Sequence, residues 1–511
     1  MGPYYPTCRA AAALARTGIS IALICTAATG ASAATRTVNA GGDLQAALNA
    51  AQPGDEIVVQ AGARFTGSFG LPAKPDGPVI VIKSSATVPL RRVGPADASL
   101  MPTIVSPTVD PALSATDTSN WRLEGIRFEA NPYGEYNVIS LQNVNNVTMD
   151  RLIIVGGPNG QKRGIMGNGR NVTLMRSYIA NIWKSGQDSQ AFCAWDGAGP
   201  YTVTDNYLEA ASENVMFGGA NSQSADRIPS DILVEGNLFT KPLAWKGVPH
   251  AVKNLFELKS ARRVTIRNNV FEHNWTDAQN GYAILFTVRN DEGGSPWSVV
   301  EDVLFERNIV RDVENGINVL GYDSYKPSGR TTRVTIRHNL VVTAGTFLQA
   351  GGEVGTLVVD HNTVDQGYNF GMLYAGAVWP AGLPAARTAA FAVENLTLTN
   401  TLAYHRQYGL MGEDAGTGTP ALTRQTRSYR WTNNVLAGAT TQPYPDVTWR
   451  PTVPQHQAQF NPDYTLVATS TYKNAATDGT DLGVNWALMQ PGARTPLPPQ
   501  NLRIVTNSSG E

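Results

Sequence analysis

Two cations and a carboxylate lie in this sequence at spacings that could bring them together. Glu257 and Lys259 belong to the run NLFELK, and Arg289 ends a second run, AILFTVR. Alternate residues of a strand face the same side, so Glu257 and Lys259 point outward if Phe256 and Leu258 point inward. If the two runs are neighbouring strands about 4.8 Å apart, Lys259 and Arg289 lie side by side. The cluster is either a solvated group of charges or a site at which a lysine, its pKa lowered by a nearby cation, removes a proton.

A repeated asparagine phrase sets the positions of these runs. The phrase begins at Asn206, Asn237, Asn269, Asn308, Asn339, Asn362, Asn400 and Asn434, and an alternating run of Val, Ile or Leu precedes most copies. Short strands of this kind stack in parallel, and an asparagine at the bend tolerates a left-handed backbone and can bond the next asparagine one coil away. We therefore predict an all-β, single-stranded right-handed parallel β-helix of roughly ten coils, with structural asparagines.

The same pattern divides the chain into four segments. Residues 1–34 have the charged, apolar and small-residue order of a secretory signal peptide, so we expect a secreted protein, extracellular or periplasmic. Residues 35–440 form the predicted β-helix, and 35–75 are its N-terminal cap and first coil, with a short helix capped by Asp43. Residues 441–494 are a closing segment and 495–511 a linker-like tail, after which a further module could follow.

Composition argues against several classes of protein. The net charge of −1 is unlike that of a nucleic-acid-binding protein. No apolar run after the signal is long enough to span a bilayer. Cys193 is the remaining cysteine, which indicates a buried apolar residue without an internal disulfide. The sequence does not specify an oligomeric state.

Insertions enter the predicted coil at its corners. Four follow the runs at 214–218, 282–289, 317–321 and 372–376, and a fifth, KPLAWKGVPHAVK, enters from the other side. Loops on two corners would flank one outward strip and form a groove suited to an extended polymer. We expect the groove to bind substrate through Glu257, Asn318, Trp245, Lys246, His250 and Asp323.

Two family resemblances bear on fold and chemistry. The start GGDLQAALNAAQPGDEIVV and the asparagine-punctuated coils resemble the pectin-lyase-like β-helix superfamily over nearly all of the mature chain. That superfamily includes lyases, hydrolases, esterases and non-enzymatic fibres, so this resemblance implies a fold and no single reaction. The stretch NLFELKSARRVTIRNNVF, followed by AILFTVRN, is similar to the catalytic stretch of the alginate lyase and chondroitinase B family.

The second resemblance implies a reaction and a metal. It places Lys259 as the base that removes the proton next to a uronate carboxylate, with Arg289 assisting, on an anionic polysaccharide. The family also holds calcium with carboxylates just before the lysine. Here Asn254 stands at the expected acidic position, with Glu257 nearby and Glu213 one coil earlier, so this calcium site departs from the family pattern.

Two alternatives to a polysaccharide lyase stay open. A glycoside hydrolase could use the same groove if Asp291, Glu292 and Asp323 supply two carboxylates about 6.5–9.5 Å apart. A non-catalytic glycan-binding or cell-surface β-helix protein would bind the polymer without cleaving it.

Overall fold

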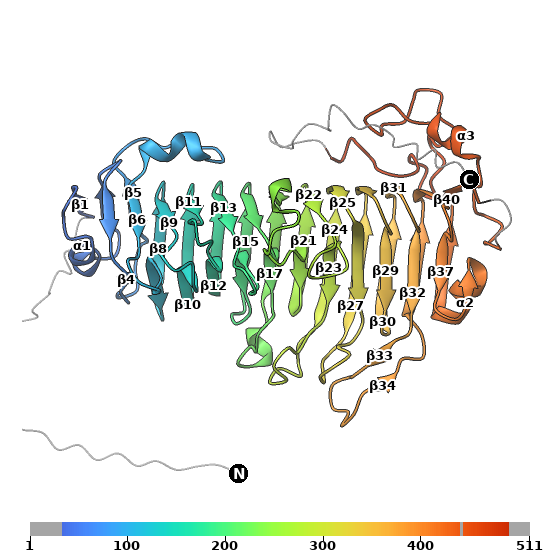
Figure 1. Ribbon diagram of the computed structural model, residues 1–511, viewed down its shortest axis with the longest axis horizontal. Helices are drawn as coiled ribbons and strands as arrows, with labels where there is room; N and C mark the ends of the chain where they lie inside the picture. The colour runs from blue at the N-terminus through green and yellow to red at the C-terminus, as the bar shows by residue number, and fades with distance from the viewer. Residues whose placement is uncertain (1–32, 440–442, 490–511) are drawn as a thin grey trace, which may run out of the picture.

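The computed structural model describes residues 33–439 and 443–489 and shows a long parallel β-helix (Figure 1). The predicted tail and nearly all of the predicted signal peptide lie outside these residues. Each coil contributes up to three strands, which pair in parallel with the equivalent strands of the neighbouring coils. Among the described residues, no helix is both long and apolar enough to cross a membrane. The predicted fold class is confirmed.

The third strands of the coils form one sheet of 13 strands. It consists of β3 (Arg64–Thr66), β6 (Thr103–Val105), β9 (Arg127–Glu129), β11 (Ile153–Val155), β13 (Tyr178–Ile182), β16 (Tyr207–Ala210), β19 (Leu238–Thr240), β22 (Val270–Asn274), β25 (Ile309–Val313), β28 (Leu340–Thr343), β31 (Thr363–Gln366), β36 (Leu402–Tyr404) and β40 (Val435–Ala437). The helix is therefore longer than the roughly ten coils expected, because the first coils lack the asparagine phrase.

The first and second strands share a sheet of 25 strands. The first strands are β4 (Phe69–Leu71), β7 (Leu113–Thr116), β14 (Gln190–Ala194), β17 (Glu213–Phe217), β20 (Asn254–Leu258), β23 (Tyr282–Thr287), β26 (Asn315–Leu320), β29 (Leu348–Gly351), β32 (Gly371–Tyr374) and β37 (Leu410–Gly412). The second strands are β1 (Thr35–Val38), β2 (Glu56–Val59), β5 (Ile80–Ser84), β8 (Ser119–Glu124), β15 (Tyr201–Thr204), β18 (Ser230–Glu235), β21 (Ala261–Arg267), β24 (Val300–Glu306), β27 (Thr331–Arg337), β30 (Val354–Asp360), β35 (Val393–Thr399) and β39 (Thr426–Thr432). In two early coils, β10 (Asn137–Asp150) and β12 (Arg163–Met175) run through both positions. The remaining strand of this sheet, β38 (Gly416–Thr417), pairs antiparallel with β37.

A ladder of asparagines joins consecutive coils at the bend between the second and third strands. Asn237 Oδ1 accepts hydrogen bonds from both the backbone N–H and the side-chain Nδ2 of Asn206, each at 2.9 Å. The same paired bonds continue from Asn237 through Asn269, Asn308 and Asn339 to Asn362. Each coil thus satisfies the buried polar groups of the coil before it.

Two details of the predicted ladder were wrong. The ladder position after Asn362 is Thr401, not Asn400, because Thr401 Oγ1 accepts from the Asn362 N–H at 3.4 Å. Asn400 stands one residue earlier and has φ of +52°. The left-handed backbone occurs at this preceding position, as at Asn268 and His338, and not at the ladder asparagines themselves. A ladder asparagine needs an extended backbone so that its N–H and its amide point toward the same neighbouring coil.

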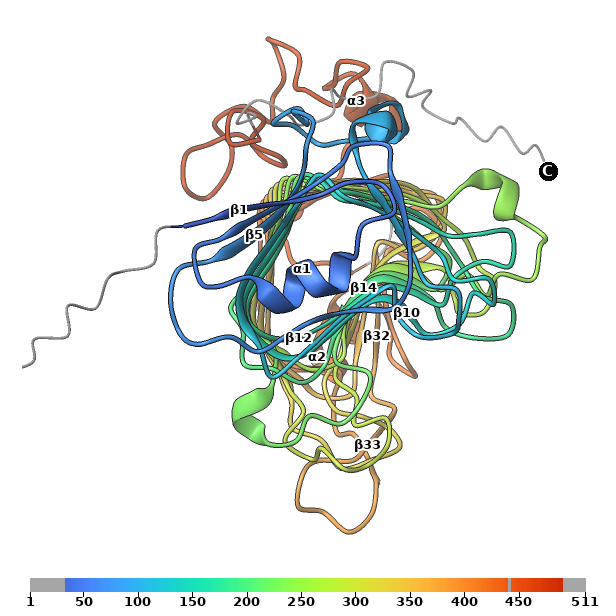
Figure 2. The same ribbon diagram turned by 90° about the vertical axis from the view of Figure 1, so that its left-hand side faces the viewer.

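Both ends of the helix are covered. Helix α1 (Leu44–Ala50) lies across the opening of the first coil, and Asp43 caps it by accepting from the Ala46 N–H at 2.9 Å, as predicted (Figure 2). Helix α2 (Thr419–Gln425) packs against the last coil. The segment 443–489, which includes α3 (Val453–Gln457), folds back over the outer face of the 13-stranded sheet. There Tyr464 and Val484 pack with Met489 on a row of apolar side chains, Val270, Ile309 and Leu340.

A buried lysine stabilises one corner of the β-helix. Lys241 follows β19 and is fully buried. Its ammonium donates to the backbone oxygens of Ala210, Ala211, Ser212 and Asn254, at 2.8 to 3.2 Å, and to Asn214 Oδ1 at 2.8 Å. These acceptors lie just before β17 and at the starts of β17 and β20, so one side chain fixes two neighbouring first strands. Burial lowers the pKa of Lys241 to about 7, and the negative charges of Glu213 and Glu209 oppose this shift.

We expect Asn308→Ala to destabilise the protein by about 2–3 kcal/mol, because Asn269 then loses the acceptor for two buried donors. Denaturant unfolding measures this change. Asn395→Ala is the matched control, since Asn395 is exposed and outside the ladder, and it should cost less than about 0.5 kcal/mol. Equal effects of the two substitutions would contradict a ladder that stabilises the coils.

Lys241→Met should destabilise the protein by about 3–5 kcal/mol, because it leaves five buried oxygens without their shared donor. Thermal and denaturant unfolding would report the loss. Lys473→Met, at a partly exposed lysine paired loosely with Asp481, serves as the control and should change stability little. A Lys241→Met protein as stable as this control would show that the corner does not depend on the ammonium.

Candidate functional site

A cavity of about 320 Å³ opens on the outer face of three consecutive first strands, β20, β23 and β26. The structure brings Glu257, Lys259, Arg289 and Asn318 together in it, as their alternation predicts. Leu285 and Thr287 of β23 complete the floor, and the loop between β22 and β23 forms one wall with Ala278, Gln279 and Asn280. The cavity is therefore built from a strip of outward residues and one connecting loop.

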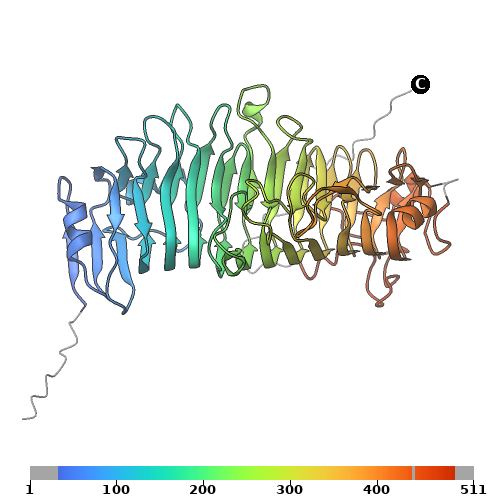
Figure 3. The same ribbon diagram turned by 90° about the horizontal axis from the view of Figure 1, so that it is seen from below.

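A row of loops leaves the same corner of successive coils, at the ends of the first strands, and Asp291 of one of these loops reaches Lys259 (Figure 3). The loop after β17 includes the 3₁₀ turn η2 (Ala225–Arg227), and the loop after β32 contains the short antiparallel pair β33 (Ala377–Val378) and β34 (Arg387–Thr388). The loops brace each other: Asn221 Nδ2 donates to Glu292 Oε2 at 2.9 Å, and Trp297 Nε1 to Ser222 Oγ at 2.9 Å. The predicted bank of stacked loops is present.

Lys259 lies in an acidic surrounding that reverses the expected shift of its pKa. Its side chain is 15% exposed, and Nζ lies 3.2 Å from Asp291 Oδ2. Burial by itself would lower the pKa of Lys259, but the carboxylates of Glu257, Asp291 and Glu213 outweigh burial and raise the pKa above its usual value. The prediction that a neighbouring cation lowers this pKa was wrong, because the strand carboxylates of Glu257 and Glu213 and the loop carboxylate of Asp291 together outweigh burial.

Arg289 is held at the edge of the cavity by a buried carboxylate. Its Nη1 lies 3.2 Å from Asp323 Oδ1, and its guanidinium lies 5.8 Å from the centre of the Tyr325 ring. Asp323 is buried and also accepts from the backbone N–H groups of Asn290 and Tyr325, both at 2.8 Å. Asp323 therefore positions Arg289 and its loop, which corrects its expected place among the residues that contact substrate.

A pair of buried glutamates lies beneath the cavity. Glu257 Oε2 accepts from Asn254 Nδ2 at 3.0 Å, and Glu213 Oε2 accepts from Gln190 Nε2 at 2.7 Å. Burial, followed by the neighbouring charge of Glu257, raises the pKa of Glu213 to about 7. The ammonium of Lys253 lies 3.5 Å from Glu213 Oε1 and partly balances this charge. The arrangement places two carboxyl groups and two lysines in one buried network.

The residues implied for calcium do not fit that ion. Calcium takes about six to eight oxygen ligands. The set of Glu213, Asn254 and Glu257 offers a cation two buried side-chain oxygens without a hydrogen-bond partner, Glu213 Oε1 and Asn254 Oδ1, whereas both carboxylate oxygens of Glu257 already accept hydrogen bonds. The described residues contain no group of three or more His, Cys, Asp or Glu side chains that could hold a metal ion. Lys253 and Lys259 supply the positive charge in this network instead.

The residues of the corner insertion lie outside the cavity. His250 stacks on Trp183 with ring centres 4.0 Å apart and meets Trp245 edge-on at 5.5 Å, and burial lowers the pKa of His250. Lys246 lies over Trp275 and lines a different cavity. Trp245, Lys246 and His250 thus do not join Lys259, because the insertion, which includes η3 (Leu243–Trp245), packs its aromatic side chains at the corner.

Sequence reasoning missed two groups that line the cavity. Tyr282 has the same parity as the inward residue Ile284 and is therefore predicted to point inward, yet at the start of β23 it lines the cavity and donates to Gln349 Oε1 at 2.8 Å. Gln279 and Asn280 lie in a connecting loop without alternation. Leu285, in contrast, follows from the alternation of β23.

No protein-family model and no curated protein sequence matches this chain. Solved structures match this chain in fold. A PL6 family alginate lyase, AlyGC, matches with a TM-score of 0.55 and 15% identity over 88% of this chain and 57% of that one. A mannuronic acid specific polysaccharide family 6 lyase from human gut microbiota matches with a TM-score of 0.50 and 14% identity over 83% of this chain and 93% of that one. This chain thus spans little more than half of AlyGC, and it has the parallel β-helix fold found in polysaccharide lyases.

Proposed function

We propose that this protein is a secreted polysaccharide lyase that cleaves a uronate-containing polymer by β-elimination. The observation that supports the proposal most is the placing of Lys259 and Arg289 on one cavity floor, beside a wall formed by the loop between β22 and β23. Both cations are partly exposed, and each is held by a loop carboxylate. A polymer with a carboxylate on each sugar suits a groove whose reachable cations lie on its floor.

The proposed reaction uses these cations in different roles. Asp323 contacts Arg289 through Nη1, which leaves Nη2 to bind the uronate carboxylate. The neutral amine of Lys259 takes the proton from the carbon next to that carboxylate, and Arg289 stabilises the negative charge that develops. The electron pair forms a carbon–carbon double bond as the glycosidic carbon–oxygen bond breaks. The departing oxygen takes up a proton from water, and Lys259 then returns the proton that it removed to the solvent. The product is an unsaturated uronate end and a new sugar hydroxyl.

The solved structures support the same class of substrate. The two neighbours above are described as an alginate lyase and as a mannuronic acid specific lyase, and both act on uronate polymers. Because the identities are 15% and 14%, this likeness supports the substrate class and names no polymer for this chain.

The alternative of hydrolysis has less support from the geometry. Inverting hydrolysis needs two available carboxyl groups. Asp323 is buried and contacts Arg289 and two backbone N–H groups. Glu292 accepts a hydrogen bond from Asn221. Asp291 forms an ion pair with Lys259. Each carboxylate considered for hydrolysis therefore already has a structural partner.

We expect Lys259→Ala and Arg289→Ala each to lower the rate of formation of unsaturated ends by about 10²–10⁴-fold, because each removes a group that acts on the reacting uronate. The ultraviolet absorbance of the product on alginate, pectate and glycosaminoglycans, with and without calcium, measures this rate. Lys246→Ala, outside the cavity, is the control and should retain activity.

Two outcomes would overturn this proposal. New reducing ends without the absorbance would indicate a hydrolase. Binding without any product on the whole panel, unchanged in Lys259→Ala, would indicate a non-catalytic glycan-binding protein.

The rate should rise with pH, because a raised pKa leaves little neutral Lys259 near neutral pH. Asp291→Asn removes one carboxylate that raises this pKa, so the rising limb of kcat/KM should move to lower pH. A pH–rate profile between about pH 6 and about pH 10 tests this shift. Glu292→Gln is the control, because Glu292 pairs with Asn221 rather than Lys259. A limb that stays in place in Asp291→Asn would remove Lys259 as the base.

A further inference from the structure

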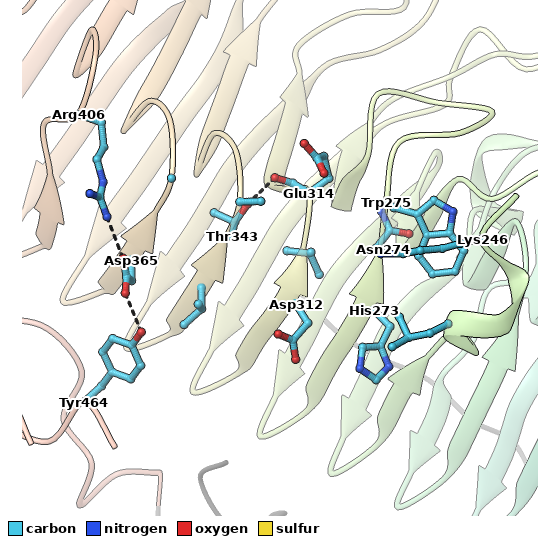
Figure 4. Close-up of a pocket in the computed structure, with 15 residues that line it drawn as sticks. Lys246, His273, Asn274, Trp275, Asp312, Glu314, Thr343, Asp365, Arg406 and Tyr464 are labelled. Atoms are coloured by element: carbon cyan, nitrogen blue, oxygen red, sulfur yellow. Dashed lines mark hydrogen bonds and ion pairs between the residues drawn. The ribbon is translucent and has the colours of Figure 1, made fainter. Parts of the chain in front are cut away.

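A second and larger cavity, of about 680 Å³, lies on another face of the helix. Its floor is the outer face of β22, β25, β28 and β31, and the corner at η3 and the C-terminal segment bound it (Figure 4). We call it the side trough, defined by Lys246, Trp275, Asp312, Glu314, Asp365 and Tyr464. Three strand spacings separate β22 from β31, so the trough extends for about 14 Å along the helix axis.

The two ends of the side trough carry aromatic rings. At one end Trp275 is half-buried, and the Lys246 ammonium lies 5.3 Å from its ring centre. At the other end Tyr464 donates to Asp365 Oδ2 at 2.7 Å, and Arg406 Nη2 lies 3.2 Å from Asp365 Oδ1 (Figure 4). The Arg406 end is closed by its own hydrogen bonds, whereas Trp275 is held by no bond to its indole nitrogen among the described residues. Lys246 covers part of the Trp275 ring, so a ligand would meet this ring beside the ammonium.

The middle of the side trough is acidic. Asp312 and Glu314 lie between the two ends, and both are exposed (Figure 4). Within the described residues neither carboxylate has an ion-pair partner. Carboxylates accept hydrogen bonds from sugar hydroxyls and repel anionic groups. A ligand therefore meets carboxylates in the middle of the side trough, whereas it meets Lys259 and Arg289 in the Lys259 cavity.

A short loop separates the two cavities. After β22 the chain passes from Asn274 and Trp275, which line the side trough, to Gln279 and Asn280, which line the Lys259 cavity. The two sites therefore lie on opposite sides of one ridge, and a ligand in the trough does not touch Lys259 or Arg289.

We propose that the side trough is a non-catalytic binding site for a neutral glycan chain. One sugar ring packs on the part of the Trp275 ring that the Lys246 ammonium leaves uncovered, and hydroxyl groups donate to Asp312 and Glu314. The carboxylates disfavour the anionic polymer that suits the Lys259 cavity. This site stands independently of the proposed lyase reaction, since it uses other residues and another face of the helix.

Titration calorimetry with neutral hexasaccharides of β-linked glucose, mannose and xylose, and with an oligouronate, tests the proposal. At least one neutral oligosaccharide should bind wild type and Arg289→Ala alike. Trp275→Ala should weaken that binding by about tenfold or more, through loss of the stacking surface. Tyr429→Ala, at an exposed aromatic outside both cavities, is the matched control and should leave binding unchanged.

A second variant covers the case in which Trp275→Ala does not fold. Asp312→Asn combined with Glu314→Gln alters two exposed side chains and should likewise weaken neutral-glycan binding. No binding of any neutral oligosaccharide, or binding that survives both variants, would overturn the proposal. Binding of the oligouronate that Trp275→Ala removes and Arg289→Ala spares would also overturn it. The ultraviolet assay of lyase activity is a separate readout, so failure of one proposal does not imply failure of the other.

Discussion

The hydrogen bonds between stacked asparagines from Asn206 to Asn362 determine the register of the coils that form both cavities. A one-residue slip in a strand would turn each outward side chain inward, and the amide ladder prevents it by pairing two donors with one acceptor in each coil. Glu257, Leu285 and Asn318 lie in register because their coils are locked at Asn269, Asn308 and Asn339. The outward side chains of such a scaffold are therefore spaced as regularly as the ladder asparagines.

The Lys259 cavity shows how this scaffold combines regular and irregular parts. The strands supply the floor at fixed spacing, and the loops supply Asp291 and Asp323, which hold Lys259 and Arg289. The negative charges of buried Glu213 and Glu257 are balanced by the positive charges of nearby lysines, so cations and anions lie close together in this site. Charge balance of this kind favours a lysine that is protonated until a substrate or a higher pH changes its surroundings.

Much of the fold followed from the sequence because alternation and the asparagine phrase are local signals. They predicted the parallel coils, the capping helix and the outward strip that contains Glu257 and Lys259. What they missed depends on contacts between distant residues. At one ladder position, the hydroxyl of Thr401 takes the place of an asparagine amide. The carboxylate of Asp323 points back toward its own loop, where it accepts from the Tyr325 N–H. The contact of Asp291 with Lys259 and the packing of His250 on Trp183 likewise arise from loops whose paths no periodic pattern specifies.

The return of the C-terminal segment along the 13-stranded sheet has a consequence for how the molecule unfolds. A simple solenoid couples each coil to its neighbours alone and can fray from either end. Here Tyr464, Val484 and Met489 touch the outer side chains of Val270, Ile309 and Leu340, which belong to three different coils. The segment 443–489 must detach before the middle coils can open separately. The segment 443–489 therefore makes the coils beneath both cavities one cooperative unit. Local opening of these coils is suppressed until the whole segment detaches from them.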